Sequence, residues 1–159
     1  MGNRYQNLKN GIIMLHEHPH IWVTDKSHVY QSPPMYRADQ NEFYNMVVEI
    51  DTNLIPVDLL NEIKNIEKKA GRLLERKKNM PRILDIDILA IGDLQIHSGL
   101  LEIPHGGISE RIFVLKPWND IAPNFVVPGQ NAKVSEILEN TDDASDVHMV
   151  LIFDKEGMI

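Results

Sequence analysis

Residues 81–92 of the chain read Pro-Arg-Ile-Leu-Asp-Ile-Asp-Ile-Leu-Ala-Ile-Gly, a run of aliphatic residues interrupted by two aspartates. The aliphatic residues predict a strand over 83–91, and side chains two positions apart in a strand lie on the same face. Asp85 and Asp87 therefore project together, about 7 Å apart along the backbone. Two neighbouring carboxylates repel each other, and removing them from water is costly. A divalent cation is the simplest partner that would neutralise the pair.

An isolated D-x-D most often lies on the solvated face of an edge strand, but the surrounding residues favour a functional site here. Apolar Ile83, Leu89 and Ile91 share the face of the aspartates, so that face is not simply polar. A basic segment comes directly before the strand, and an aspartate pair beside it suggests a site for metal and phosphate. The cations of this segment are Lys64, Lys68, Lys69, Arg72, Arg76, Lys77, Lys78 and Arg82.

The composition of the chain limits the classes of protein it can belong to. Its 159 residues fit one domain with a sizeable core. The net charge of −7 argues against general nucleic-acid binding. There is no cysteine, which excludes disulfides and thiolate zinc sites and allows a reducing cytoplasm. No apolar run approaches the length of a membrane span, and the N-terminus does not read as a signal peptide.

Hydrophobic periodicity predicts helices that interleave with strands. Connections between them are short and of the antiparallel type, so we expect an α+β fold in two layers. The segment His16–His20, which reads HEHPH, is interpreted as a surface turn. The predicted helices cover residues 3–16, 56–70, 111–115 and 134–138, and the predicted strands cover 21–31, 43–51, 83–91 and 94–96.

Other side chains are candidates for ligand contacts. Arg72 and Arg82 flank the charged connection before the aspartate strand, and guanidinium groups bind phosphate bidentately. Phe43 and Phe113 could face a planar heterocycle whose edge Asn45 reads, although core packing is the commoner role of a phenylalanine. Neither the P-loop nor the Rossmann glycine pattern is present, so those phosphate sites are excluded.

The sequence around the aspartates resembles the 6-hydroxymethyl-7,8-dihydropterin pyrophosphokinase family of the folate pathway. Residues 81–89 match its pattern P-R-x-x-D-[LIV]-D-[LIVM]-[LIVM], which is far more specific than a lone D-x-D. The resemblance extends over nearly the whole chain. Further matching segments are S-P-P at 32–34, F-Y-N at 43–45, I-E-K-K-A-G-R at 66–72, I-P-H at 103–105, R-I-F-V-L at 111–115 and I-A-P at 121–123.

The resemblance implies a role for each matching position. Asp85 and Asp87 would be the ligands of two magnesium ions, and Arg72 and Arg82 would be the catalytic residues that bind the triphosphate. Contacts to the nucleotide are implied for Glu67, Ile88, His105 and Arg111. Contacts to the pterin are implied for Ser32, Pro33, Pro34, Met35, Phe43, Asn45 and Phe113.

The resemblance also implies the reaction and the architecture. Pyrophosphate would move from ATP to the hydroxymethyl group of the pterin, with release of AMP. The protein would be a single cytoplasmic domain, residues 1–159, that binds small molecules and neither nucleic acid nor a membrane. Its fold would be a two-layer ferredoxin-like sandwich, with helices packed on an antiparallel sheet.

The largest departure from the family pattern is at the N-terminus. Family members usually open with a strand that ends in a Gly-Ser-Asn-type turn, directly before the segment that matches 2–4. We therefore expect the first strand to be missing from this chain, and the incomplete sheet to favour self-association. Two alternatives stay open: a truncated, non-catalytic pterin- or nucleotide-binding form, and a metal-dependent hydrolase or nucleotidyltransferase that uses the same D-x-D.

Overall fold

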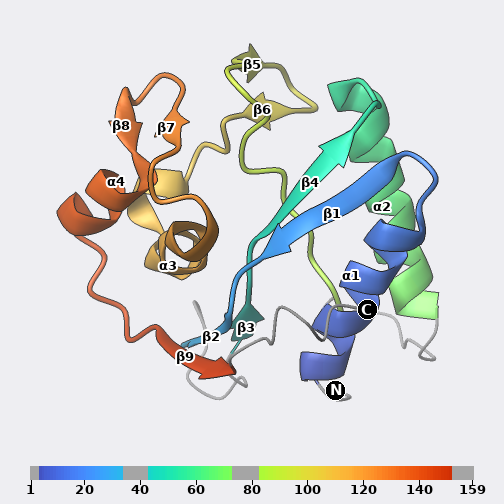
Figure 1. Cartoon of the computed structure of the whole chain (residues 1–159), viewed down its shortest axis with the longest axis horizontal. Helices are drawn as coiled ribbons and strands as arrows, with labels where there is room; N and C mark the ends of the chain where they lie inside the picture. Colours follow the sequence, from blue (N-terminus) through green and yellow to red (C-terminus); the bar gives the residue numbers. More distant parts are fainter. Residues whose placement is uncertain (1–3, 34–42, 73–82, 152–159) are drawn as a thin grey trace.

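The helices and strands divide between two halves of the molecule. A computed structural model describes residues 4–33, 43–72 and 83–151. The predicted α+β class is confirmed, with small antiparallel sheets packed against helices (Figure 1). In chain order the elements are α1 (Arg4–Glu17), β1 (Ile21–Lys26), β2 (Val29–Ser32), β3 (Phe43–Asn45), β4 (Val48–Thr52), α2 (Pro56–Arg72), β5 (Ile96–His97), β6 (Glu102–Ile103), the 3₁₀ turn η1 (Ile108–Glu110), α3 (Ile112–Ile121), β7 (Val126–Val127), β8 (Ala132–Lys133), α4 (Val134–Asn140) and β9 (His148–Leu151).

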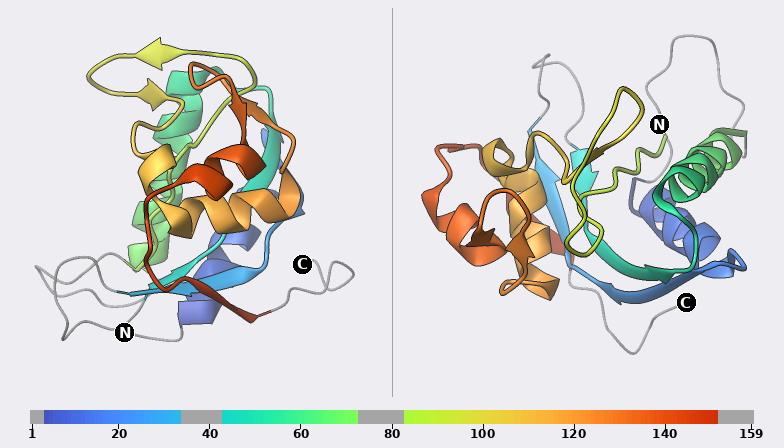
Figure 2. Two further views of the ribbon diagram at one scale, coloured as in Figure 1. Left: turned by 90° about the vertical axis from the view of Figure 1, so that its left-hand side faces the viewer. Right: turned by 90° about the horizontal axis from the view of Figure 1, so that it is seen from above.

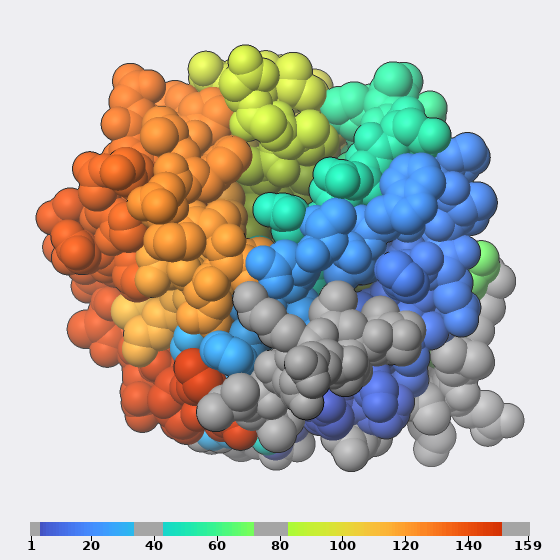
Figure 3. Space-filling model, viewed as in Figure 1, coloured from blue at the N-terminus to red at the C-terminus, as the bar shows by residue number. Residues whose placement is uncertain are grey.

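The first half packs α1 and α2 against a ribbon of two antiparallel strands, β1 and β4. Ile21 and Val23 of β1 are buried on the helix side, whereas Trp22 on the opposite side is 47% exposed. Part of the outer face of the ribbon is visible in the space-filling view (Figure 3). Leu59, Ile63 and Ile66 form the core face of α2. This first core cluster contains Ile12, Leu15, Ile21, Val23, Leu59, Ile63 and Ile66.

In the second half, α3 packs against β2, and α4 packs against α3. Strand β2 pairs with β3 on one edge and with β9 on the other. A polar contact ties β2 to α3: the Tyr30 hydroxyl lies 2.8 and 3.0 Å from the two carboxylate oxygens of Asp120. Burial, this hydrogen bond and the nearby negative charge all raise the pKa of Tyr30. The second core cluster contains Val47, Ile108, Leu115, Trp118, Val127, Val134 and Ile137.

Each of the two predicted strands, 21–31 and 43–51, is divided into two shorter strands, and the two breaks lie opposite each other. Ser27 lies at the break and is 1% exposed. Its N–H donates to the Val47 carbonyl, and its hydroxyl accepts from the Val47 N–H, each at 2.8 Å. These bonds replace the regular ladder at the point where the chain passes from one half of the molecule to the other. The strands therefore appear as β1 and β2, and as β3 and β4.

The prediction of a strand over 83–91 is wrong, because in the described part of the chain this segment makes no strand-pairing hydrogen bonds. The backbone is extended, and burial alternates from Leu84 to Asp87 as in a strand. Within the described part of the chain, however, residues 84–91 join no sheet. The segment runs between the α1–α2 pair and α3, at the boundary of the two halves (Figures 1 and 2).

Helix α3 is longer than the sequence predicts. The predicted helix 111–115 continues as α3 to Ile121, with Pro117 inside it and buried. Because a proline lacks only one N–H, the helix gives up a single bond there and keeps its buried face. The predicted turn after α1 is confirmed, and His18 in it contacts Glu62 of α2 at 2.9 Å. Among the described residues, no helix is both long enough and apolar enough to cross a membrane.

Candidate functional site

The extended segment 84–91 is fixed by contacts to three neighbours. Leu84 packs so close to Gly11 of α1 that a Cβ there would lie 2.8 Å from the Leu84 Cδ2 atom. The Ile86 N–H donates to the Glu67 carboxylate of α2 at 3.2 Å. The Leu89 carbonyl accepts from the His105 N–H at 2.8 Å. These contacts fix the path of the backbone, which in a sheet would be fixed by hydrogen bonds to the neighbouring strands.

The two aspartates project from this segment as predicted. Asp85 and Asp87 are both exposed, and the intervening Ile86 is half-buried against the first core cluster. Two carboxylates on one exposed face are donors that Mg²⁺ accepts, since it completes its shell with water and phosphate oxygens. Among the described residues there is no group of three or more His, Asp or Glu side chains placed to hold a metal. An ion held by two carboxylates would leave its remaining coordination positions to water and phosphate oxygens.

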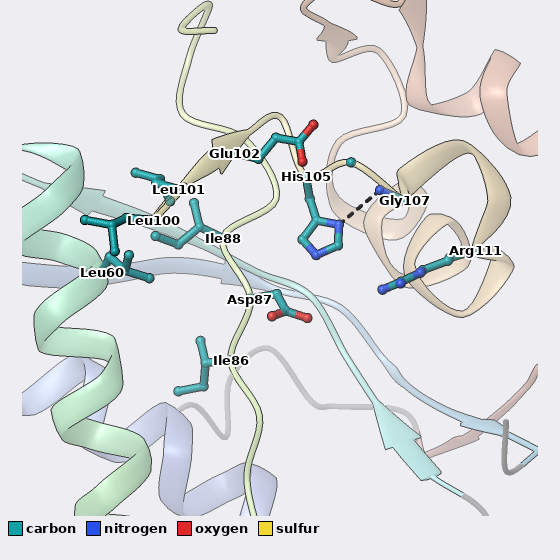
Figure 4. A pocket seen from close by; sticks show the side chains of 11 residues that line it. Leu60, Ile86, Asp87, Ile88, Leu100, Leu101, Glu102, His105, Gly107 and Arg111 are labelled. Atoms are coloured by element: carbon teal, nitrogen blue, oxygen red, sulfur yellow. Dashed lines mark hydrogen bonds between the residues drawn. The ribbon is translucent and has the colours of Figure 1, made fainter. Parts of the chain in front are cut away.

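Asp87 lines a cleft of about 520 Å³, which lies between α2, the β5–β6 hairpin and the start of α3. That volume is within the range of about 300–1,000 Å³ typical of small-molecule sites. Figure 4 shows aliphatic side chains gathered toward α2, with Asp87, His105 and Arg111 on the other side of the cleft. The lining residues are Leu60, Ile86, Asp87, Ile88, Leu100, Leu101, Glu102, His105, Gly106, Gly107 and Arg111.

His105 presents a defined hydrogen-bonding face. Its Nδ1 atom accepts from the Gly107 N–H at 3.2 Å, so the neutral ring carries its proton on Nε2. The His105 backbone N–H is bonded to the Leu89 carbonyl, which ties this loop to the aspartate segment. The ring therefore offers an N–H donor to the polar side of the cleft, where an anionic ligand would accept it.

Arg111 precedes α3 and lies half-buried in the same cleft. Its guanidinium carbon is 6.0 Å from the centroid of the Phe113 ring. Gly107 makes room for this side chain, because a Cβ at that position would lie 2.8 Å from the Arg111 Nε atom. A cation beside an aspartate and a histidine N–H suits a ligand that carries both phosphate and metal.

Asp143, which the sequence did not single out, anchors the start of α3. Its carboxylate accepts from the Ile112 N–H at 2.9 Å and from the Ser145 N–H at 2.9 Å. Burial by itself would raise the pKa of Asp143, but hydrogen bonds from the Ser145 hydroxyl and these two N–H groups outweigh it and lower the pKa. Because Arg111 and Phe113 flank Ile112, the contact positions two predicted site residues. No local pattern links residues so far apart in the chain.

Those predicted pterin residues that the structure describes lie on β2, β3 and α3, or directly after β2. Ser32 is buried and accepts from the Asn45 amide at 2.8 Å across the β2–β3 pair. Phe43 is 45% exposed in β3, and α3, which carries Phe113, packs beside that strand. Pro33 is exposed directly after β2. These residues form a second group, separate from the residues that line the cleft.

The cleft brings together Asp87, Ile88, His105 and Arg111 from the predicted set. Glu67 is not among the described lining residues and instead contacts the Ile86 backbone. The sequence analysis did not select Leu60, Leu100, Leu101 and Glu102. Neither an aliphatic residue nor a single glutamate in a helix or hairpin carries a signal that it will face a ligand. Pro34, Met35, Arg82 and the side chain of Arg72 lie outside the described part of the chain.

Comparison with known proteins identifies the family. A family model described as 7,8-dihydro-6-hydroxymethylpterin-pyrophosphokinase matches residues 1–123. The chain belongs to this family, and the resemblance found in the sequence is confirmed.

Relatives include both long and short proteins. The chain is 39% identical over 150 residues to the folic acid synthesis protein of Dictyostelium discoideum, covering 94% of this chain and 22% of that protein. It is 38% identical over 133 residues to the 2-amino-4-hydroxy-6-hydroxymethyldihydropteridine pyrophosphokinase of Methylorubrum extorquens, covering 84% of each. The chain thus spans about a fifth of the length of the first relative and most of the second.

We predict that Asp143→Ala lowers the free energy of unfolding by about 1 kcal/mol at neutral pH, the usual effect of losing a helix cap. Because the folded pKa is lowered, the stability from Asp143 is present above its unfolded pKa of about 3.9 and is lost as pH falls through the folded value. Urea unfolding between about pH 7 and about pH 3 should show the difference from the unmodified chain shrinking with acidity. Asp142→Ala, at the exposed neighbouring position, is the matched control. A difference that does not depend on pH would contradict the prediction.

Proposed function

We propose that this chain transfers pyrophosphate from ATP to the hydroxymethyl group of 6-hydroxymethyl-7,8-dihydropterin, releasing AMP, as a step of folate biosynthesis. The observation that carries the proposal is the cleft in which Asp87, His105 and Arg111 face a wall of aliphatic side chains. A nucleoside triphosphate has the same two-part chemistry, since its base is flat and largely apolar whereas its phosphates are anionic. Membership of the family supports the same reaction.

The proposed reaction forms one bond and breaks one bond. The hydroxymethyl oxygen attacks the β-phosphorus of ATP, the bond from that phosphorus to the α–β bridging oxygen breaks, and AMP leaves with the bridging oxygen. The hydroxyl proton passes to solvent. Because the protein supplies no covalent intermediate, its contribution is to align the reactants and stabilise the charge of the phosphates.

Each side chain has a role in this scheme. Two Mg²⁺ ions held by Asp85 and Asp87 would neutralise the phosphate charge, and this is the chemistry the metal supplies. Arg111 and the His105 N–H bind phosphate oxygens, and Ile88 contacts the nucleotide on the apolar side. Arg72 and Arg82 bind the triphosphate as the catalytic cations. The pterin lies between Phe43 and Phe113, with its polar edge toward Asn45 and the backbone at Ser32, Pro33, Pro34 and Met35.

The architecture proposed for the whole chain is one cytoplasmic domain, residues 1–159, of the two-layer ferredoxin-like kind. The packing of α1 and α2 on one face of the β1–β4 ribbon supports this (Figure 2). In the described part of the chain β4 pairs only with β1, and the extended segment 84–91 joins no sheet. Unpaired strand edges are templates for pairing with another chain, so we also propose self-association through these edges.

Self-association predicts that the apparent mass of the protein rises with concentration. Sedimentation velocity over a wide concentration range measures this directly. Val48→Pro or Ile50→Pro in β4 would remove a backbone donor and should reduce the association of a chain that stays folded. The matched change Trp22→Thr, on the outer face of β1, leaves the backbone donors in place. A monomer at every concentration would refute this part of the proposal.

For the reaction itself we predict that Asp85→Ala/Asp87→Ala lowers pterin-dependent AMP release by about a hundredfold or more, because the phosphate charge loses its metal ligands. AMP is measured from ATP and Mg²⁺ with and without the hydroxymethyl-dihydropterin. Asp93→Ala removes a carboxylate from the exposed turn that follows the segment, and it should leave the rate unchanged. Binding of ATP by the unmodified chain without AMP release would indicate the non-catalytic form, and AMP release without pterin would indicate a hydrolase.

We further predict that Gly107→Ala raises the KM for ATP several-fold. The backbone at Gly107, with φ −111° and ψ 12°, accepts any residue, so the new methyl group acts only by displacing the Arg111 guanidinium. Steady-state kinetics with varied ATP measures the effect. Gly99→Ala is the control, because a Cβ there meets nothing within 4 Å. Equal KM values for the two variants would show that the position of Arg111 is unimportant for ATP binding.

A further inference from the structure

The backbone between the two aspartates is held from α2. The Ile86 N–H donates to the Oε2 atom of Glu67 at 3.2 Å, and Ile86 is the residue between Asp85 and Asp87. We infer that Glu67 is a positioning residue, whose carboxylate fixes the peptide between the aspartates and thereby sets the spacing and direction of both metal-binding side chains. This inference rests on the proposed function and gives Glu67 a different role from the direct nucleotide contact that the family resemblance implied.

Such a contact is needed because, in the described part of the chain, residues 84–91 have no hydrogen bonds to neighbouring strands of a sheet. In a sheet, bonds to neighbouring strands fix the backbone, and a backbone N–H that leaves water must find another partner. Residues 84–91 join no sheet in the described part of the chain, yet Leu84 is buried and Ile86 is half-buried. The Glu67 carboxylate supplies an acceptor at Ile86, and a charged acceptor makes a stronger bond to an N–H than a neutral one.

The geometry of α2 assigns this task to Glu67. Leu60, Ile63 and Glu67 lie at positions i, i+3 and i+7, on one side of the helix. Leu60 lines the cleft, Ile63 is buried in the first core cluster, and Glu67 reaches the aspartate segment. Because the buried Ile63 packs α2 against the core, the carboxylate of Glu67 lies level with Ile86 of the extended segment.

The consequence for the metal follows from its coordination chemistry. Mg²⁺ requires nearly octahedral geometry at short oxygen distances, so it tolerates little displacement of its carboxylate ligands. Groups that orient the ligands of a metal typically change its affinity by about 10–100-fold when they are removed. With Ile86 held, the Cα atoms of Asp85 and Asp87 have a fixed separation, and both carboxylates leave the backbone toward the same side.

Three variants at Glu67 separate the bond from the charge. Glu67→Ala removes the acceptor, Glu67→Asp keeps the charge but withdraws it by one methylene, and Glu67→Gln keeps an oxygen that can accept from Ile86. We expect the half-saturating Mg²⁺ concentration to rise about tenfold in the Ala and Asp variants. The Gln variant, whose neutral oxygen makes a weaker bond, should show a clearly smaller rise than the Ala variant. Asp58→Ala, which removes an exposed carboxylate from the same helix, is the control.

Two measurements make the result independent of turnover. Electron paramagnetic resonance follows Mn²⁺ binding to the chain with a non-hydrolysable ATP analogue, and amide hydrogen exchange reports on the Ile86 N–H. Weaker Mn²⁺ binding together with faster exchange at Ile86 in the Ala or Asp variant, with KM for ATP unchanged at saturating Mg²⁺, would support the inference. The Asp variant provides the comparison where the Ala variant does not fold.

Two outcomes would overturn the inference. If Glu67→Gln weakens metal binding as much as Glu67→Ala, the charge and not the hydrogen bond matters. If the variants raise KM for ATP at saturating Mg²⁺ and leave Mn²⁺ binding unchanged, Glu67 contacts the nucleotide directly. Failure of the proposed function has a separate signature, namely an unmodified chain that binds Mn²⁺ and the ATP analogue but releases no pterin-dependent AMP.

Discussion

The extended segment 84–91 is the constraint on which the rest of the site depends. It lies between the two core clusters, with aliphatic side chains packed into both and two aspartates turned outward. Burial of Ile86 and Ile88 on one side leaves Asp85 and Asp87 only the other side to occupy, because side chains alternate along an extended backbone. The hydrophobic effect therefore directs the carboxylates, although no carboxylate is itself part of the core.

The same boundary explains why the cleft has two chemically different sides. On the side of α2, aliphatic side chains next to the first core cluster line the cleft. On the side of α3, the cleft is lined by Arg111, at the start of that helix, and by the loop that holds His105. A ligand that binds here contacts both halves of the molecule. The described residues among the predicted pterin contacts lie on β2, β3 and α3, which are elements of the second half.

Much of this arrangement was predictable from the sequence. The α+β class, the helices α1 and α2 and the common direction of Asp85 and Asp87 followed from periodicity, and the family followed from residues 81–89. The break at Ser27 was not predictable, because its hydroxyl bonds to Val47, a long-range partner. Asp143 and Leu60 were missed for the same reason: a helix cap from a distant loop and an aliphatic cleft wall exist only in the folded chain.

The contact of Leu84 with Gly11 has a consequence for how α1 can vary. Glycine weakens a helix interior, so a substitution to almost any other residue would favour the helix by itself. At this position a side chain would press on Leu84, one residue before the aspartates. Amino-acid choice in the first helix is thus limited by a requirement that arises some seventy residues later, and local helical stability is given up to satisfy it.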